Sequence, residues 1–313
     1  MVLLNLSNQG LTELPSIPDN VTELWCYNNK LRALPDLPSG LTRLVCYGNQ
    51  LTSLPELVPG LRALVCSTNQ LTALPDLPPG LTTLDCSNNQ LTALPKLVPG
   101  LTALLCSTNQ LTALPKLVPG LTTLWCSGNQ LTALPELPPG LTALWCSGNQ
   151  LTALPELPAR LTRLVSSNNQ LTSLVDLPAG LTELICSENQ LTALPVLPAG
   201  LIRLVCDFNP FPEELQRILN RYRGNTPQLI ISVKHYTAEQ RRRKNIRYAG
   251  RTYRNMSLSG PYEYTNVLSH IGHIATGHKP TGNLQKTLRN LKINHNSYGP
   301  RKQRKTKTRK HRR

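Results

Sequence analysis

Residues 121–140 read LTTLWCSGNQ LTALPELPPG, and this unit recurs with a period of 20 across residues 11–210 without an insertion or deletion. Each copy places leucine or cysteine at alternate positions ahead of an asparagine. A fixed period of this length is the signature of a solenoid, because one unit cannot bury its apolar face except against its neighbours. The sequence therefore predicts a repeat solenoid over residues 1–210.

The alternation within a unit predicts where the strands lie. A period of two sends Leu144 and Cys146 to one face and Trp145 to the other. Each copy, from residues 3–7 to 203–207, is therefore expected to give one short parallel strand on the concave face. The other half of the unit is too short and too rich in proline for a helix, so an extended or polyproline-like segment is expected on the convex side.

Two inward columns of the repeat are predicted to be structural. Asparagine recurs every 20 residues from Asn29 to Asn209, and stacked amides can satisfy backbone groups of successive loops. All nine cysteines, from Cys26 to Cys206, share another column, which Ser166 alone interrupts. An odd, uniform ladder lacks the paired spacing of disulfides and the clustered ligands of zinc, so core packing is expected, with no metal and no cofactor. Unpaired buried thiols favour a reducing compartment, the cytosol or nucleus.

The outward face of the strands carries the main functional prediction. Its central column is apolar from Leu105 to Val205 and holds all three tryptophans of the chain. An apolar stripe with tryptophan is typical of an interaction surface, although strand propensity alone also selects such residues. The predicted protein-binding residues are Trp25, Tyr27, Tyr47, Leu105, Trp125, Trp145, Val165, Ile185 and Val205.

Over residues 1–222 the unit resembles the 20-residue class of leucine-rich repeats. This class is typical of effectors that Gram-negative pathogens secrete, and similar arrays occur in large DNA viruses. The resemblance implies a parallel-strand solenoid that binds host proteins inside the host cell. Some of these effectors also carry a ubiquitin ligase domain with a Cys-x-Asp nucleophile, but no cysteine follows Cys206 here. Ligase activity is therefore not expected.

The charge of the chain divides it into two parts. The formal net charge is +16, with −4 in residues 1–210 and +20 in residues 211–313. Residues 211–224 are predicted to form a capping helix with acids in its first turn, over Phe208 and Phe211. Residues 225–300 are a basic region of uncertain order, and residues 301–313 are predicted to be a disordered tail.

Within the basic region, Gln228–Val233 is compatible with a strand. Thr237–Gln240 has the capping-box pattern that opens a short helix ending near Gly250. The leucines of residues 284–291 suggest a second helix. Three histidines at residues 270–278 have no cysteine nearby and little acidic support, and they are not expected to bind metal.

The basic residues predict a second interaction. Lysine or arginine occupies nine of the thirteen tail positions, which suits nonspecific nucleic-acid or other polyanion binding, nuclear targeting, or solvation alone. The candidate residues are Arg241, Arg242, Arg243, Lys244, Arg301, Lys302, Arg304, Lys305, Arg309, Lys310, Arg312 and Arg313.

No nucleophile–base pair, carboxylate pair or phosphate loop stands out from the repeats, and no segment has the ~20 consecutive apolar residues of a membrane span. The leading prediction is a non-enzymatic intracellular scaffold that binds a protein on its concave face. The alternative is a nuclear or nucleic-acid-associated protein that acts through its basic C-terminal region.

Overall fold

The computed structural model describes residues 2–223 and 226–255. The chain divides into two compact units, Met1–Thr237 and Ala238–Arg313. The predicted second helix at residues 284–291, the three histidines and the tail at residues 301–313 lie outside the described residues.

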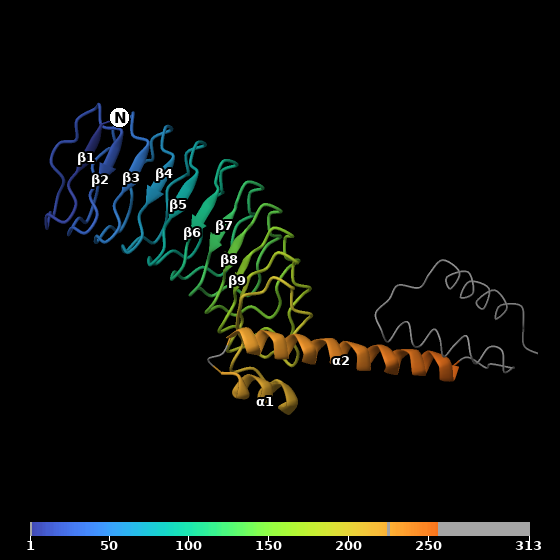
Figure 1. The fold of residues 1–313 in the computed structure, drawn as a ribbon. Helices are drawn as coiled ribbons and strands as arrows, with labels where there is room; N and C mark the ends of the chain where they lie inside the picture. Colours follow the sequence, from blue (N-terminus) through green and yellow to red (C-terminus); the bar gives the residue numbers. More distant parts are fainter. Residues whose placement is uncertain (1, 224–225, 256–313) are drawn as a thin grey trace, which may run out of the picture. The chain divides into compact units, whose positions relative to one another are not determined.

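The repeats form one sheet of eleven parallel strands whose spatial order is the order of the sequence (Figure 1). Each 20-residue repeat contributes one strand, and equivalent residues of neighbouring strands pair in register. The predicted solenoid is therefore confirmed. The regular strands are three residues long, shorter than the five-residue segments expected. They are β1 (Leu3–Asn5), β2 (Glu23–Trp25), β3 (Arg43–Val45), β4 (Ala63–Val65), β5 (Thr83–Asp85), β6 (Ala103–Leu105), β7 (Thr123–Trp125), β8 (Ala143–Trp145), β9 (Arg163–Val165), β10 (Glu183–Ile185) and β11 (Arg203–Val205).

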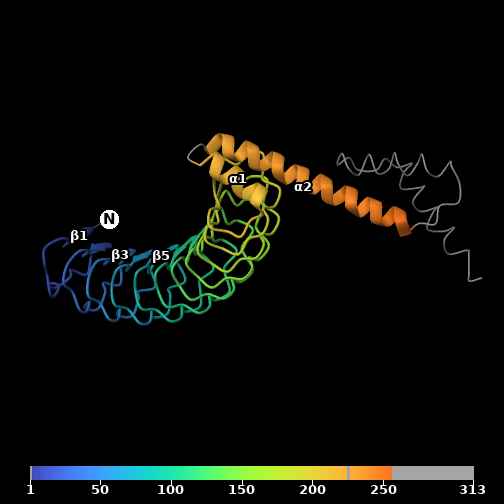
Figure 2. The same ribbon diagram turned by 90° about the horizontal axis from the view of Figure 1, so that it is seen from below.

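The core runs as one continuous column behind the strands. The inward leucine and cysteine of a repeat, such as Leu124 and Cys126, have no exposed surface. The return segments have no regular secondary structure and end in turns, one of which is closed by the amide of Leu41 donating to the carbonyl of Pro38 at 2.9 Å. Figure 2 shows the strands along the inner side of the curved ribbon and the return segments along its outer side.

The asparagine column is the hydrogen-bonding spine that the sequence predicts. The side-chain amide of Asn129 donates to the carbonyls of Cys106 and Cys126, each at 3.1 Å, and its Oδ1 accepts from the amide of Leu111 at 3.0 Å. The amide thus joins its own repeat to the preceding one. The same contacts recur along the column, for example at Asn109.

The C-terminal end of the ribbon is covered by helix α1 (Glu213–Arg221). Leu215 and Leu219 are buried in the same core cluster as the repeats, and Phe211 is 4% exposed. The expectation that Phe208 also lies beneath the helix is wrong, since that side chain is 73% exposed. Phe208 occupies a loop position with a positive φ of 56°, where other repeats also direct an exposed side chain outward.

Helix α2 (Thr226–Asn255) replaces the strand expected at Gln228–Val233. Ile230 and Val233 are buried and Tyr236 is half-buried, a spacing of three residues that suits a helix face. A short apolar run does not distinguish a strand from a buried helix turn, which explains the error.

The predicted helix start at Thr237 is also wrong. Because α2 is continuous there, Thr237 lies inside it and its hydroxyl donates to the carbonyl of Lys234 at 3.1 Å, instead of capping a helix. Lys234 in turn donates to the carbonyl of Ala199 at 2.9 Å, so the first turns of α2 are tied to the last repeat. None of the described helices is both long and apolar enough to cross a bilayer.

Candidate protein-binding face

The concave face presents three outward columns of side chains. The third residue of each strand forms the central column, which is half-buried over most of its length because in-register neighbours shield one another. The central column is therefore less exposed than the sequence suggested, and Val45 is buried, with 7% of its surface exposed. The central column comprises Asn5, Trp25, Val45, Val65, Asp85, Leu105, Trp125, Trp145, Val165, Ile185 and Val205.

The in-register pairing of β7 with β8 stacks two tryptophans. The rings of Trp125 and Trp145 have centroids 4.1 Å apart and are inclined by 5°. The rings of Tyr27 and Tyr47 stack in the same way at 4.7 Å, in the flanking column two residues further along the chain. The predicted aromatic residues thus form two stacked pairs at separate places on the face.

The surroundings of the tryptophan pair are uncharged. Serine dominates the flanking column, and the backbone amide of Ser147 donates to the hydroxyl of Ser127 at 3.1 Å. Alanine and threonine form the other flanking column at these repeats. No charged side chain lies in the three outward columns between Asp85 and Arg163, all of which the structure describes.

One polar atom of the pair has an unusual environment. Nε1 of Trp145 is inaccessible to solvent and has no hydrogen-bond partner among the described residues. A buried indole N–H normally finds an acceptor. Burying an N–H group without an acceptor destabilises the folded state. The valines and leucine at equivalent positions of other repeats carry no such group, so stability alone would not select tryptophan at position 145.

Two acids on the concave face differ in how they are compensated. Glu183 lies between Arg163 and Arg203, with nitrogen–oxygen distances of 3.9 and 2.9 Å. Asp85 accepts a hydrogen bond from the backbone amide of Ser87 at 3.1 Å. Our sequence-based prediction did not include Asp85 among the candidate residues, although it is the one charge in the central column.

The cysteine column is buried and its thiols are free. Burial raises the pKa of Cys26 and of Cys146 to about 12. Burial is also the largest cause of the raised pKa of Cys106, and the neighbouring Cys126 and Asp85 raise this pKa further. Such thiols are protonated at neutral pH and shielded from solvent, unlike a nucleophilic or metal-binding cysteine.

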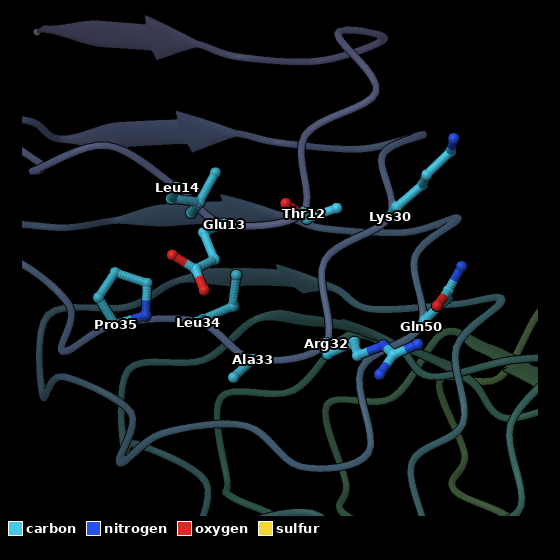
Figure 3. Close-up of a pocket in the computed structure, with 9 residues that line it drawn as sticks. All are labelled: Thr12, Glu13, Leu14, Lys30, Arg32, Ala33, Leu34, Pro35 and Gln50. Atoms are coloured by element: carbon cyan, nitrogen blue, oxygen red, sulfur yellow. The ribbon is translucent and has the colours of Figure 1, made fainter.

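A surface hollow of about 740 Å³ lies between the first repeats, remote in sequence from the tryptophan pair. In Figure 3 the side chains of Lys30 and Arg32 extend to one side, whereas the carboxylate of Glu13 points toward Leu34. The charged groups that line this hollow therefore do not point toward one common position, as they would in a ligand-binding site. Within residues 2–223 and 226–255, no three histidine, cysteine or acidic side chains are grouped as metal ligands.

Four of the predicted polyanion-binding residues lie on α2. Arg241, Arg242, Arg243 and Lys244 are exposed, and Glu239 forms ion pairs with Arg242 and Arg243 at 4.0 and 3.0 Å. The remaining eight, in residues 301–313, lie outside the described chain.

Comparison with known proteins agrees with the geometry of the repeats. A family model of the leucine-rich repeat matches residues 80–101. The chain belongs to the leucine-rich repeat family. The 20-residue period of its repeats fits the class that the sequence resembles. A comparison with curated protein sequences found no significant match.

Two solved leucine-rich repeat structures are similar to this one. YopM from Yersinia enterocolitica WA-314 is 33% identical over 68% of this chain and 61% of its own, with a TM-score of 0.54. The functional domain of InlJ from Listeria monocytogenes, described as including a cysteine ladder, is 30% identical over 63% of this chain and 46% of its own, with a TM-score of 0.53. This chain thus spans less than two thirds of either relative.

Proposed function

We propose that this leucine-rich repeat chain is a non-enzymatic scaffold that captures a protein on its concave face, centred on Trp125 and Trp145. The stacked, half-buried tryptophan pair within an uncharged surface carries this proposal. Tryptophan is enriched among the residues that dominate binding energy, and a stacked pair offers a broad surface with little side-chain entropy left to lose.

Strand propensity does not explain the pair equally well. Strands β9 and β11 carry valine in the central column and pair in the same register. Their inward leucines, Leu164 and Leu204, are 0% and 3% exposed, so both are buried, as are the inward leucines of β7 and β8. The ribbon therefore forms without tryptophan there, and the unpartnered Nε1 of Trp145 adds a cost.

The proposed setting is the interior of a cell. Nine free buried thiols in one inward column suit a reducing compartment. The resemblance to the effector class favours a host protein as the target of a viral or pathogen scaffold.

The experiment is affinity capture from host-cell lysate with the full chain and with the Trp125→Ala, Trp145→Ala double variant. We expect the double variant to lose at least about tenfold of the captured partner, as for residues that dominate an interface. The matched control replaces Val196 and Ile202, which are exposed apolar residues outside the central column, by alanine. Equal capture by all three proteins, with unchanged thermal unfolding, contradicts the proposal.

The exposed basic run on α2 favours a second candidate, nonspecific polyanion binding. Glu239 forms ion pairs with two of these four adjacent cations, Arg242 and Arg243, so residues 239–244 keep a net positive charge. Binding of single-stranded oligonucleotides across a salt series tests it. Affinity should fall steeply with salt and fall further after Arg241→Ala and Lys244→Ala substitution. Affinity independent of salt contradicts it.

A further inference from the structure

Asp85 is the one charged side chain among the eleven described residues of the central column. Its register partners on the neighbouring strands are Val65 and Leu105. The residues two positions before and after it, Thr83 and Ser87, are neutral. A single carboxylate is thus set into an uncharged surface two strands away from Trp125.

The ribbon leaves this carboxylate uncompensated. Among the described residues, no cationic nitrogen lies within 4.0 Å of Asp85, whose carboxylate accepts a 3.1 Å hydrogen bond from the amide of Ser87. On the same face, Glu183 has an arginine on each side. The fold can therefore neutralise an acid on this surface, as it does at Glu183 and does not at Asp85.

The fold also does not need the charge of Asp85. Asn5 occupies the equivalent position of the first repeat, and its Oδ1 accepts the same hydrogen bond from the amide of Ser7 at 3.0 Å. In the other nine repeats the central column is apolar. An amide therefore reproduces the local structure, and an apolar residue replaces it without changing the register.

We infer that the protein partner presents a lysine or arginine that pairs with Asp85, next to apolar side chains that cover Leu105 and Trp125. This inference rests on the proposed function, because it specifies the chemistry of the segment bound on that face. A partner that covers the stripe removes water from the carboxylate. An isolated charge taken out of water opposes binding unless a cation replaces the lost hydration.

The strand spacing sets the distance between the two contacts. Asp85 and Trp125 are two strands apart, or about 10 Å at the usual spacing in a sheet. An extended peptide covers this distance in about three residues. The bound segment is therefore a basic residue followed or preceded, about three residues away, by an aromatic or large aliphatic residue.

A random 12-residue peptide display library selected on the full chain tests the inference. Peptides enriched on the wild type should share a lysine or arginine at this spacing from an apolar residue. They should bind the Asp85→Asn variant at least about tenfold more weakly. The Asp85→Lys variant should instead enrich aspartate or glutamate at the same place. Asp85→Asn is the matched variant, because Asn5 shows that an amide keeps the backbone hydrogen bond.

The outcomes separate this inference from the proposed function. Peptides that lose binding after Trp125→Ala and Trp145→Ala substitution but carry no basic residue, or bind Asp85→Asn unchanged, overturn the inference and leave the binding face in place. Peptides that bind regardless of both tryptophans contradict the proposed face itself. Failure to enrich any shared pattern also overturns the inference, and the lysate capture then decides separately on the proposed function.

Discussion

The buried hydroxyl of Ser166 lowers the stability of the repeat core. It interrupts the cysteine column, is fully buried, and its hydroxyl has no hydrogen-bond partner among the described residues. A thiol at the same position in the neighbouring repeats is a small hydrophobe that makes no such demand. The departure from the repeat was visible in the sequence, but its cost depends on the absence of an acceptor.

Replacing Ser166 by cysteine should therefore stabilise the protein by about 1–2 kcal/mol, since the unpaired hydroxyl is removed from the core. The measurement is the urea unfolding midpoint under reducing conditions. The reverse change, Cys146→Ser, is the matched control and should lower the midpoint. An unchanged or lowered midpoint for Ser166→Cys contradicts this account of the column.

At the scale of a structural element, the asparagine column joins one repeat to the next. The side chain of Asn129 donates to backbone carbonyls of its own and of the preceding repeat, and it accepts a hydrogen bond from the backbone amide of Leu111. The regular spacing of asparagine predicted this role. The first turns of helix α2 were not predicted, because their buried face comes from contact with the last repeat and not from a long sequence pattern, whereas the helix predicted from Thr237 to near Gly250 lies within its later part.

Asn129→Ala should destabilise the chain by about 3 kcal/mol or more, because three buried backbone groups lose their partners. Chemical unfolding monitored by circular dichroism measures the change. Gln130→Ala is the control, since this neighbouring side chain is exposed and should change stability by less than about 0.5 kcal/mol. Comparable losses in the two variants would show that the column does not hold the repeats together.

At the scale of the whole molecule, the stacked thiols couple stability to pH. Burial raises the pKa of Cys26 and Cys146 to about 12 from an ordinary 9.0, and raises the pKa of the other cysteines of the ladder as well. Between these values the unfolded chain loses thiol protons that the folded chain keeps. The unfolded state then binds fewer protons, so stability falls as pH rises.

The free energy of unfolding should be independent of thiol ionisation below about pH 8 and fall steeply above pH 9, with each thiol contributing up to about 1.4 kcal/mol per pH unit. Urea midpoints from pH 7 to 10.5 measure the slope. The Ser166→Cys variant adds a tenth thiol to the column and should make the slope steeper. A flat profile to pH 10.5 would falsify the burial of the ladder.

The period of 20 residues determined the solenoid, the parallel strands and the inward columns, because each of these follows from local alternation repeated without interruption. The tertiary structure decided which side chains stack, are exposed or form ion pairs at particular positions of the repeats. It shows that Trp125 and Trp145 stack, that Phe208 is exposed while Phe211 is buried, and that Glu183 is paired whereas Asp85 is not. These properties depend on the distances between side chains of different repeats, and a repeat pattern alone does not contain them.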